Sequence, residues 1–198
     1  DLGFVSATGN TKLTTLTVGE KLSRTDGRWL LSQLAAYVYG ETNNKQSANL
    51  TRFAVRADYA WRPRFGGFVG AAYERNTFAG YNRRTDEMLG LLWRALAEPN
   101  DVLSLDAGGV LTQQANVDGT NRDAPSARFA GNYKHAFTKA AYFQQLAEYL
   151  ADLKSGGGYR VNTESAVVAP VSSHIGIKIA YAVRYNSKPP ATFGTTDR

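Results

Sequence analysis

Charged side chains that recur at every second position are the residues of this sequence most suited to chemistry. Between Asn49 and Arg62, for example, Arg56 and Asp58 lie on the same parity. Successive side chains of a β-strand point to opposite faces, so such residues share one face of a strand. The pattern recurs along the chain and predicts one charged, inward-facing set. Its members are Arg52, Arg56, Asp58, Arg62, Glu74, Arg84, Asp86, Arg94, Asp106, Arg128, Lys134, Glu148, Arg160, Glu164, Lys178 and Arg184.

Two kinds of chemistry suit guanidinium and carboxylate groups that face each other in a narrow space. They can neutralise each other in a structural network of salt bridges. Alternatively, they can line a narrow wet channel whose excess of arginine prefers small anions, because field lines focus between low-dielectric walls. The sequence leaves both interpretations open.

The sequence offers little for catalysis. The only two histidines are His135 and His174. Ser173 and His174 are neighbours on opposite strand faces, so they cannot form the hydrogen-bonded pair that a serine hydrolase needs. His135 has the outward parity beside Phe137, which favours a structural role. No spacing of histidines or carboxylates suggests a metal site, and no glycine cluster has the strand-to-helix context of a phosphate loop. We therefore expect no enzymatic activity and no cofactor.

The charged face has an apolar counterpart on the same strands. From His174 to Asn186 one face is wholly apolar, whereas the other carries Lys178 and Arg184. A soluble sandwich would turn such an apolar face inward, and a membrane barrel would turn it outward to lipid. On the membrane interpretation the lipid-facing residues are Phe53, Val55, Tyr59, Trp61, Leu89, Leu91, Trp93, Ile175, Ile177, Ile179 and Tyr181.

Three regularities favour the membrane interpretation. Alternating segments recur evenly, and each is long enough for the ~9–11 residues of a tilted membrane strand. Short connections, such as Pro63-Arg64, alternate with polar segments that we expect to be loops, such as Glu41 to Ala48 and Ala115 to Pro125. Outer-membrane barrels show this asymmetry. Aromatic residues also gather near the ends of the apolar faces, as interfacial girdles require. Only Ala140 to Lys154 has a competing helical periodicity, and its neighbours favour a strand.

Composition agrees with a single all-β domain over residues 1–198. Hydrophobic residues make up 43% of the chain, and there is no cysteine. No run of ~18 apolar residues is present, so we expect no transmembrane helix. The net charge is +6, but the basic residues are dispersed singly, which argues against a nucleic-acid partner.

Several short blocks give the sequence a family resemblance. They are Ser6-Ala7-Thr8-Gly9-Asn10-Thr11, Gly27-Arg28-Trp29, Tyr73-Glu74-Arg75-Asn76 with Phe78-Ala79-Gly80-Tyr81, and Tyr181 to Pro190. In order and spacing they resemble the salt-induced outer-membrane proteins, a β-barrel family defined by a domain of unknown function. The resemblance implies an outer-membrane barrel of a Gram-negative-type cell, but it does not point to any catalytic activity.

We therefore predict an antiparallel up-and-down transmembrane β-barrel. About eleven strands can be counted, whereas bacterial single-chain barrels use even numbers, so we expect about twelve strands and a closing strand beyond Arg198. The expected partners are outer-membrane lipid and lipopolysaccharide, which basic loop residues such as Lys45, Arg122 and Lys188 would meet. The expected role is structural, or that of a narrow anion-leaning channel linked to envelope or osmotic state. The alternative is a soluble β-sheet module that binds a small apolar ligand.

Overall fold

The computed structural model describes residues 2–7, 13–154, 156–171, 176–189 and 195–197. Almost all of them lie in strands. The strands are β1 (Leu2–Ala7), β2 (Leu13–Asp26), β3 (Trp29–Thr42), β4 (Lys45–Arg62), β5 (Phe65–Asn76), β6 (Tyr81–Ala97), β7 (Asp101–Asn116), β8 (Asn121–Ala136), β9 (Tyr142–Asp152), β10 (Tyr159–Pro170), β11 (Gly176–Asn186) and β12 (Thr196–Asp197). One short 3-10 helix, η1 (Thr77–Ala79), connects β5 to β6. Within the described residues, no helix is long and apolar enough to cross a membrane.

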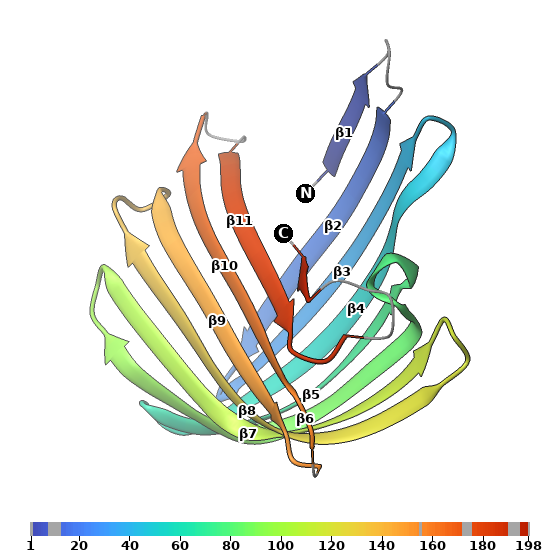
Figure 1. Cartoon of the computed structure of the whole chain (residues 1–198). Coiled ribbons are helices and arrows are strands. Elements are labelled where there is room, and N and C mark those ends of the chain that lie inside the picture. The colour runs from blue at the N-terminus through green and yellow to red at the C-terminus, as the bar shows by residue number, and fades with distance from the viewer. Residues whose placement is uncertain (1, 8–12, 155, 172–175, 190–194, 198) are drawn as a thin grey trace.

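The strands form one sheet in which each strand pairs with its neighbours in the sequence, from β1 through to β12. Every registered pair is antiparallel. Figure 1 shows the sheet curled so strongly that β11 faces β1 and β2. The predicted all-β, up-and-down barrel fold is therefore confirmed. The expected closing strand beyond Arg198 lies outside the described residues and stays a prediction.

The strands are longer than the sequence pattern predicted. The segment from Glu41 to Ala48 was expected to be a polar loop, and this prediction is wrong. Strands β3 and β4 continue to Thr42 and from Lys45, so Asn43 and Asn44 alone connect them. Both asparagines have positive φ, at 51° and 60°. This backbone geometry is that of the tight hairpin turns in which asparagine is favoured.

The segment from Ala115 to Pro125 was also expected to be a loop, but only residues 117–120 lie between β7 and β8. Asp118 Oδ1 organises this turn by accepting hydrogen bonds from the backbone N–H of Thr120, at 2.9 Å, and from its hydroxyl, at 2.6 Å. In contrast, the strand predicted within Ala140 to Lys154 is confirmed as β9. The two sets of connections therefore differ less in length than the sequence suggested.

Two paired glycines allow a close approach between β6 and β7. Gly90 and Gly108 are directly paired across these strands. A Cβ on Gly108 would lie 2.7 Å from the Gly90 Cα, and one on Gly90 would lie 2.8 Å from Phe68 Cε1. Gly109, on the opposite face, has nothing within 4 Å of an added Cβ. The absence of side chains at the pair therefore makes room for the Phe68 ring, as glycine does at the corners of barrels.

The buried side of this sheet is polar rather than apolar. Buried residues include Phe68 and Leu150, but also Asp58, Glu74 and Arg128. Among the described residues, no side chain is less than 2% exposed. A soluble sheet protein would instead bury a contiguous apolar core. The large apolar side chains lie mostly on the opposite, exposed face of the sheet.

Candidate functional site

The charged residues converge on the concave face of the curled sheet, which we call the inner face. Convergence is visible in ion pairs between strands that are not neighbours. Arg56 on β4 reaches Asp106 on β7, and Arg160 on β10 reaches Asp86 on β6. Side chains on the convex, outer face point apart and cannot make such contacts. The curl of the sheet therefore brings together residues that sequence parity alone could only place on one face.

The first group of ion pairs runs from β4 to β9. Arg56 Nη2 lies 2.8 Å from Asp58 Oδ1, and its Nη1 lies 2.8 Å from Asp106 Oδ2. The other oxygen of Asp106 lies 2.5 Å from Arg128 Nη1, whose Nε lies 2.6 Å from Glu148 Oε1. These alternating charges form a continuous chain. Asp106 contacts a guanidinium on either side, so its charge is compensated, and the two arginines and three carboxylates leave this group one net negative charge.

Phe68 lies beneath this first group. The Arg56 guanidinium carbon is 4.0 Å from the centre of the Phe68 ring, and that of Arg128 is 5.7 Å away. A cation over an aromatic face is attracted by the ring quadrupole. The ring occupies the space above Gly90, which is paired with Gly108, so the glycine pair, the aromatic ring and the arginines form one packed unit.

The second group is centred on Glu74 of β5. Its Oε1 lies 3.3 Å from Arg184 Nη1 and 3.5 Å from Arg84 Nη2, and its Oε2 lies 3.7 Å from Arg52 Nε. The Tyr81 hydroxyl also donates a hydrogen bond to Glu74. The Glu74 side chain is only 4% exposed. Three guanidinium groups therefore share one buried carboxylate, which leaves a local excess of positive charge.

Asp86 supplies a second carboxylate beside this group. It lies 3.5 Å from Arg84 Nε and 3.7 Å from Arg160 Nη2, and it accepts a 2.5 Å hydrogen bond from the Thr112 hydroxyl. The 3.5 Å contact does not satisfy Arg84 Nε as a hydrogen bond. Among the described residues, this nitrogen is the buried side-chain polar atom that lacks a hydrogen-bond partner. The cluster around Glu74 and Asp86 therefore has an N–H group free to donate a hydrogen bond, in addition to its net positive charge.

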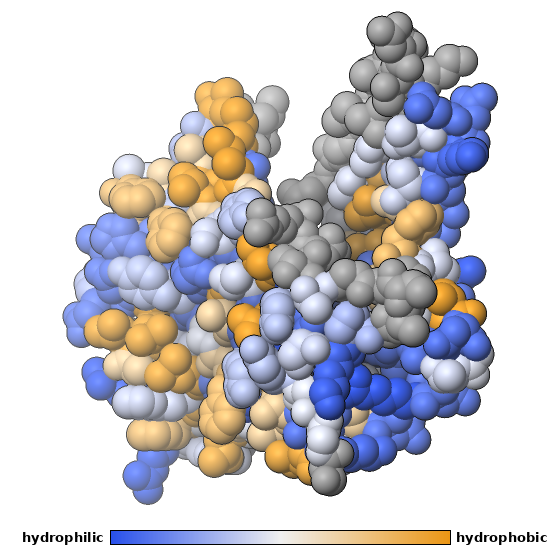
Figure 2. Space-filling model, in the orientation of Figure 1, coloured by the Kyte–Doolittle hydropathy of each residue, from blue (hydrophilic) through white to orange (hydrophobic). Residues whose placement is uncertain are grey.

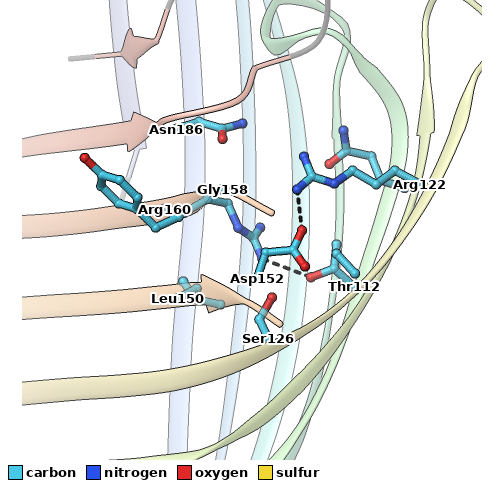
Figure 3. Close-up of a pocket in the computed structure, with 11 residues that line it drawn as sticks. Thr112, Arg122, Ser126, Leu150, Asp152, Gly158, Arg160 and Asn186 are labelled. Atoms are coloured by element: carbon cyan, nitrogen blue, oxygen red, sulfur yellow. Dashed lines mark hydrogen bonds and ion pairs between the residues drawn. The ribbon is translucent and has the colours of Figure 1, made fainter. Parts of the chain in front are cut away.

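A small cavity opens beside Arg160. It has a volume of about 20 Å³ and is lined by polar groups of Thr112, Ser126 and Asn186 among others. Figure 3 shows two polar contacts across it, from Arg122 to Asp152 and from Arg160 to Thr112. The volume suffices for one water molecule, and the polar lining would bond it.

The remaining predicted inner residues lie outside these two groups. Lys178 pairs with Glu164 at 2.9 Å, where both side chains are about one-third exposed or more. Lys134 Nζ lies 4.0 Å from the centre of the Tyr142 ring. Arg62 and Arg94 are exposed and make no ion pair with any described residue. The structure therefore brings most, but not all, of the predicted set into the two groups.

The outer face carries the residues predicted to face lipid. Exposed fractions reach 67% for Leu89, 62% for Leu91 and 72% for Ile179. Phe53, Val55, Trp61, Trp93, Ile177 and Tyr181 are also exposed, Tyr59 is half-buried, and Ile175 lies outside the described residues. Figure 2 shows hydrophobic residues, in orange, spread over the molecular surface. A large contiguous apolar surface of this kind is typical of a face that a partner or a membrane covers.

His135 forms a hydrogen-bonded pair that the sequence did not suggest. Its Nδ1 lies 2.9 Å from Asp101 Oδ1, which also accepts a 2.6 Å hydrogen bond from the Tyr133 hydroxyl. The ring packs edge-on against Phe137, with centroids 5.0 Å apart. No described serine hydroxyl is hydrogen-bonded to this histidine. The pair joins the ends of β7 and β8. Within the described chain, no three histidine or carboxylate side chains converge to hold a metal ion.

Several inner residues were missed by sequence reasoning. Phe68, Tyr81 and Thr112 are buried there, and Asn162 donates a 2.7 Å hydrogen bond to Glu148. Phe68 has the inward parity of Glu74 on β5, so its position was available from the alternation. Tyr81 follows Gly80, whose φ of 89° ends η1, and a bulge beside Glu74 then shifts the register. That shift could not be read from parity.

The fold and the inner face together define the class: an all-β, antiparallel up-and-down barrel sheet with a charged interior and an apolar exterior. Comparison with known proteins gives the family. The chain belongs to the DUF481 family, described as proteins of unknown function, whose model matches residues 1–198.

The chain is also similar to two known proteins. The chain is 25% identical over 194 residues to the uncharacterized protein YdiY of Escherichia coli (strain K12), covering 95% of this chain and 73% of that protein. Among solved structures, it is similar to the NanC porin, with a TM-score of 0.52 and 12% sequence identity. That match covers 95% of this chain and 87% of the porin. At this level of identity the porin supports the fold alone.

Proposed function

We propose that this chain is an outer-membrane β-barrel of a Gram-negative-type cell and acts as a narrow, anion-leaning channel. The observation that carries the proposal is the sharing of Glu74 by three arginines. The enclosed positive excess would attract small anions and repel cations. The exposed apolar outer face and the similarity to a porin fold support placement in a membrane.

The ion pairs also limit the width of any anion path through the interior. Arg184 on β11 meets Glu74 on β5, so side chains cross the interior between strands far apart in the sheet. A barrel of about twelve strands is wider than an eight-stranded barrel that side chains fill, but narrower than the porins of about 16–18 strands that enclose an open aqueous channel. We therefore propose passage of small inorganic anions and no general solute pore.

A second role is favoured by the same crossing contact. If the salt bridges close the interior, the protein is a structural component of the outer membrane. Its non-enzymatic character and a link to envelope or osmotic state belong to both versions of the proposal. We also propose, for both versions, that the chain is a salt-induced outer-membrane protein. The outer lipids, including lipopolysaccharide, are the proposed partners.

Conductance in planar bilayers tests the proposal. The full chain should give small single-channel currents. In a salt gradient, the sign of the reversal potential should show that anions are preferred. A clear cation preference would contradict the channel. Stable insertion without current would assign the structural role. A chain that stays monomeric in buffer without detergent, and that does not enter vesicles, would instead support the soluble module.

A further inference from the structure

The outer face of β2 to β5 contains a groove that the channel proposal does not use. Its volume is about 780 Å³, which is within the range of small-molecule sites. Large apolar side chains, including Leu22, Leu31, Val55 and Val69, line it together with the small residues Ala57 and Ala71. These four large residues are all strongly exposed, between 42% and 58%. The groove is therefore open and mostly apolar, and it lies on the convex surface.

One end of this groove is basic. Arg24, near the end of β2, is among its lining residues and is exposed. Arg28 and Arg64 lie in the adjacent turns at the same end of the sheet and are exposed as well. Within the described chain, none of these three arginines forms an ion pair. Asp26 is the acidic residue between them. The end of the groove thus carries a net positive charge.

Tryptophans mark the same end of the sheet. All three tryptophans of the chain, Trp29, Trp61 and Trp93, lie near the β2–β3, β4–β5 and β6–β7 turns on the outer face. Trp29 packs against Tyr59, with ring centroids 4.7 Å apart. Tryptophan is enriched at the level of lipid headgroups. If the proposed membrane placement holds, Arg24 is at headgroup depth and the apolar groove extends into the hydrocarbon.

We propose that this groove binds an anionic glycerophospholipid, with one acyl chain along Leu22, Leu31, Val55 and Val69 and the phosphate at Arg24. The proposal rests on the membrane placement in the proposed function. Charge complementarity selects the occupant, because an apolar groove that ends in uncompensated guanidinium groups fits an acyl chain that ends in a phosphodiester. Arginine also binds phosphate through paired donors.

Native mass spectrometry of the full chain in detergent tests the site. The probes are phosphatidylglycerol and phosphatidylcholine with identical acyl chains. Wild-type protein should retain phosphatidylglycerol preferentially. Arg24→Gln should weaken that retention about fivefold, the effect of one basic residue near an anionic lipid surface. Ala57→Phe, which fills the groove, should weaken retention of both lipids.

The matched control is Arg83→Gln. Arg83 is an exposed arginine near the opposite end of the sheet, on β6, and its substitution should leave lipid retention unchanged. Equal losses in Arg24→Gln and Arg83→Gln would reduce the effect to general electrostatics and overturn the site. Equal retention of the two lipids in wild-type protein, or displacement of phosphatidylglycerol by free glycerol phosphate, would also overturn it.

Flotation with phosphatidylcholine vesicles separates this inference from the proposed function. A chain that does not float with the vesicles would overturn the membrane placement, and the lipid site with it. A chain that floats but shows no preference for phosphatidylglycerol would overturn the lipid site alone. Flotation together with a preference lost in Arg24→Gln supports both.

Discussion

Arg184 on β11 lies 3.3 Å from Glu74 on β5, although 110 residues separate them in the sequence. The contact crosses the inner face, and Glu74 accepts two further guanidinium groups there. Glu74 therefore connects strands of the two halves of the sheet, as Asp86 does through Arg160. This makes both residues of the pair informative positions for substitution.

Glu74→Gln should destabilise the protein strongly. The substitution keeps the shape of the side chain but leaves Arg52, Arg84 and Arg184 without their shared carboxylate. Loss of one partner of a buried ion pair costs about 3 kcal/mol. Urea unfolding in lipid vesicles measures the change. The control is Glu164→Gln, whose carboxylate has one exposed partner, Lys178, and should cost less than about 1 kcal/mol. Equal losses in the two variants would contradict the central role of Glu74.

Arg184→Gln should raise the single-channel conductance and shift the reversal potential toward weaker anion preference. The reason is that the substitution removes both the contact that crosses the interior and one positive charge. Planar-bilayer recording provides the measurement. Lys178→Gln, on the same strand but in an exposed pair, is the control and should change conductance less. An Arg184 variant with unchanged current would show that the crossing contact does not limit the path.

Gly108→Ala should destabilise the sheet by about 1–3 kcal/mol, the usual cost of overpacking. The added Cβ would overlap the backbone of β6 at Gly90. Gly109→Ala is a closely matched control, because it adds the same methyl group to the neighbouring residue, where nothing lies within 4 Å. Its effect should stay within about 0.5 kcal/mol. The unfolding midpoints of the two variants measure the difference in stability. Similar midpoints would rule out the close approach of Gly108 to Gly90.

Asp118 should titrate below an ordinary aspartate. Hydrogen bonds from the hydroxyl and then the backbone N–H of Thr120 stabilise its charged form and lower its pKa. Because the folded pKa is lowered, the turn is fully stabilised above the unfolded pKa of about 3.9 and loses this contribution as pH falls through the folded pKa. Carboxyl NMR titration of the chain in micelles measures the shift. Thr120→Val should raise the pKa of Asp118 toward the ordinary value, and an unchanged titration would refute the hydroxyl contact.

The alternation of the sequence determined much of the fold. Arg56 and Val55 are adjacent, and period two alone placed them on opposite faces, where the structure has them. The strand order followed from short connections and repeated segments, since sequential antiparallel pairing needs no crossover. The helical periodicity of Tyr142 to Leu153 was correctly set aside because its neighbours were strands.

What the sequence could not supply was the contact between distant strands. Parity assigns Arg184 and Glu74 to one face, but their approach depends on the curl of the sheet and on the bulge beside Glu74. Loop boundaries failed for a related reason. Residues 41–48 are polar on both faces, so they lack the alternation of a half-buried strand. The signal in the sequence was the pair Asn43-Asn44, because asparagine tolerates the positive φ that both residues adopt in this hairpin turn.

The placement of the three tryptophans has a practical consequence. Since all of them lie near the β2–β3, β4–β5 and β6–β7 turns, fluorescence excited selectively at tryptophan reports on that one rim and not on the opposite rim. Quenchers fixed at known depths in a vesicle would therefore locate this rim without any added label. A water-soluble quencher confined to one side of the vesicle would reveal the direction in which the chain inserts.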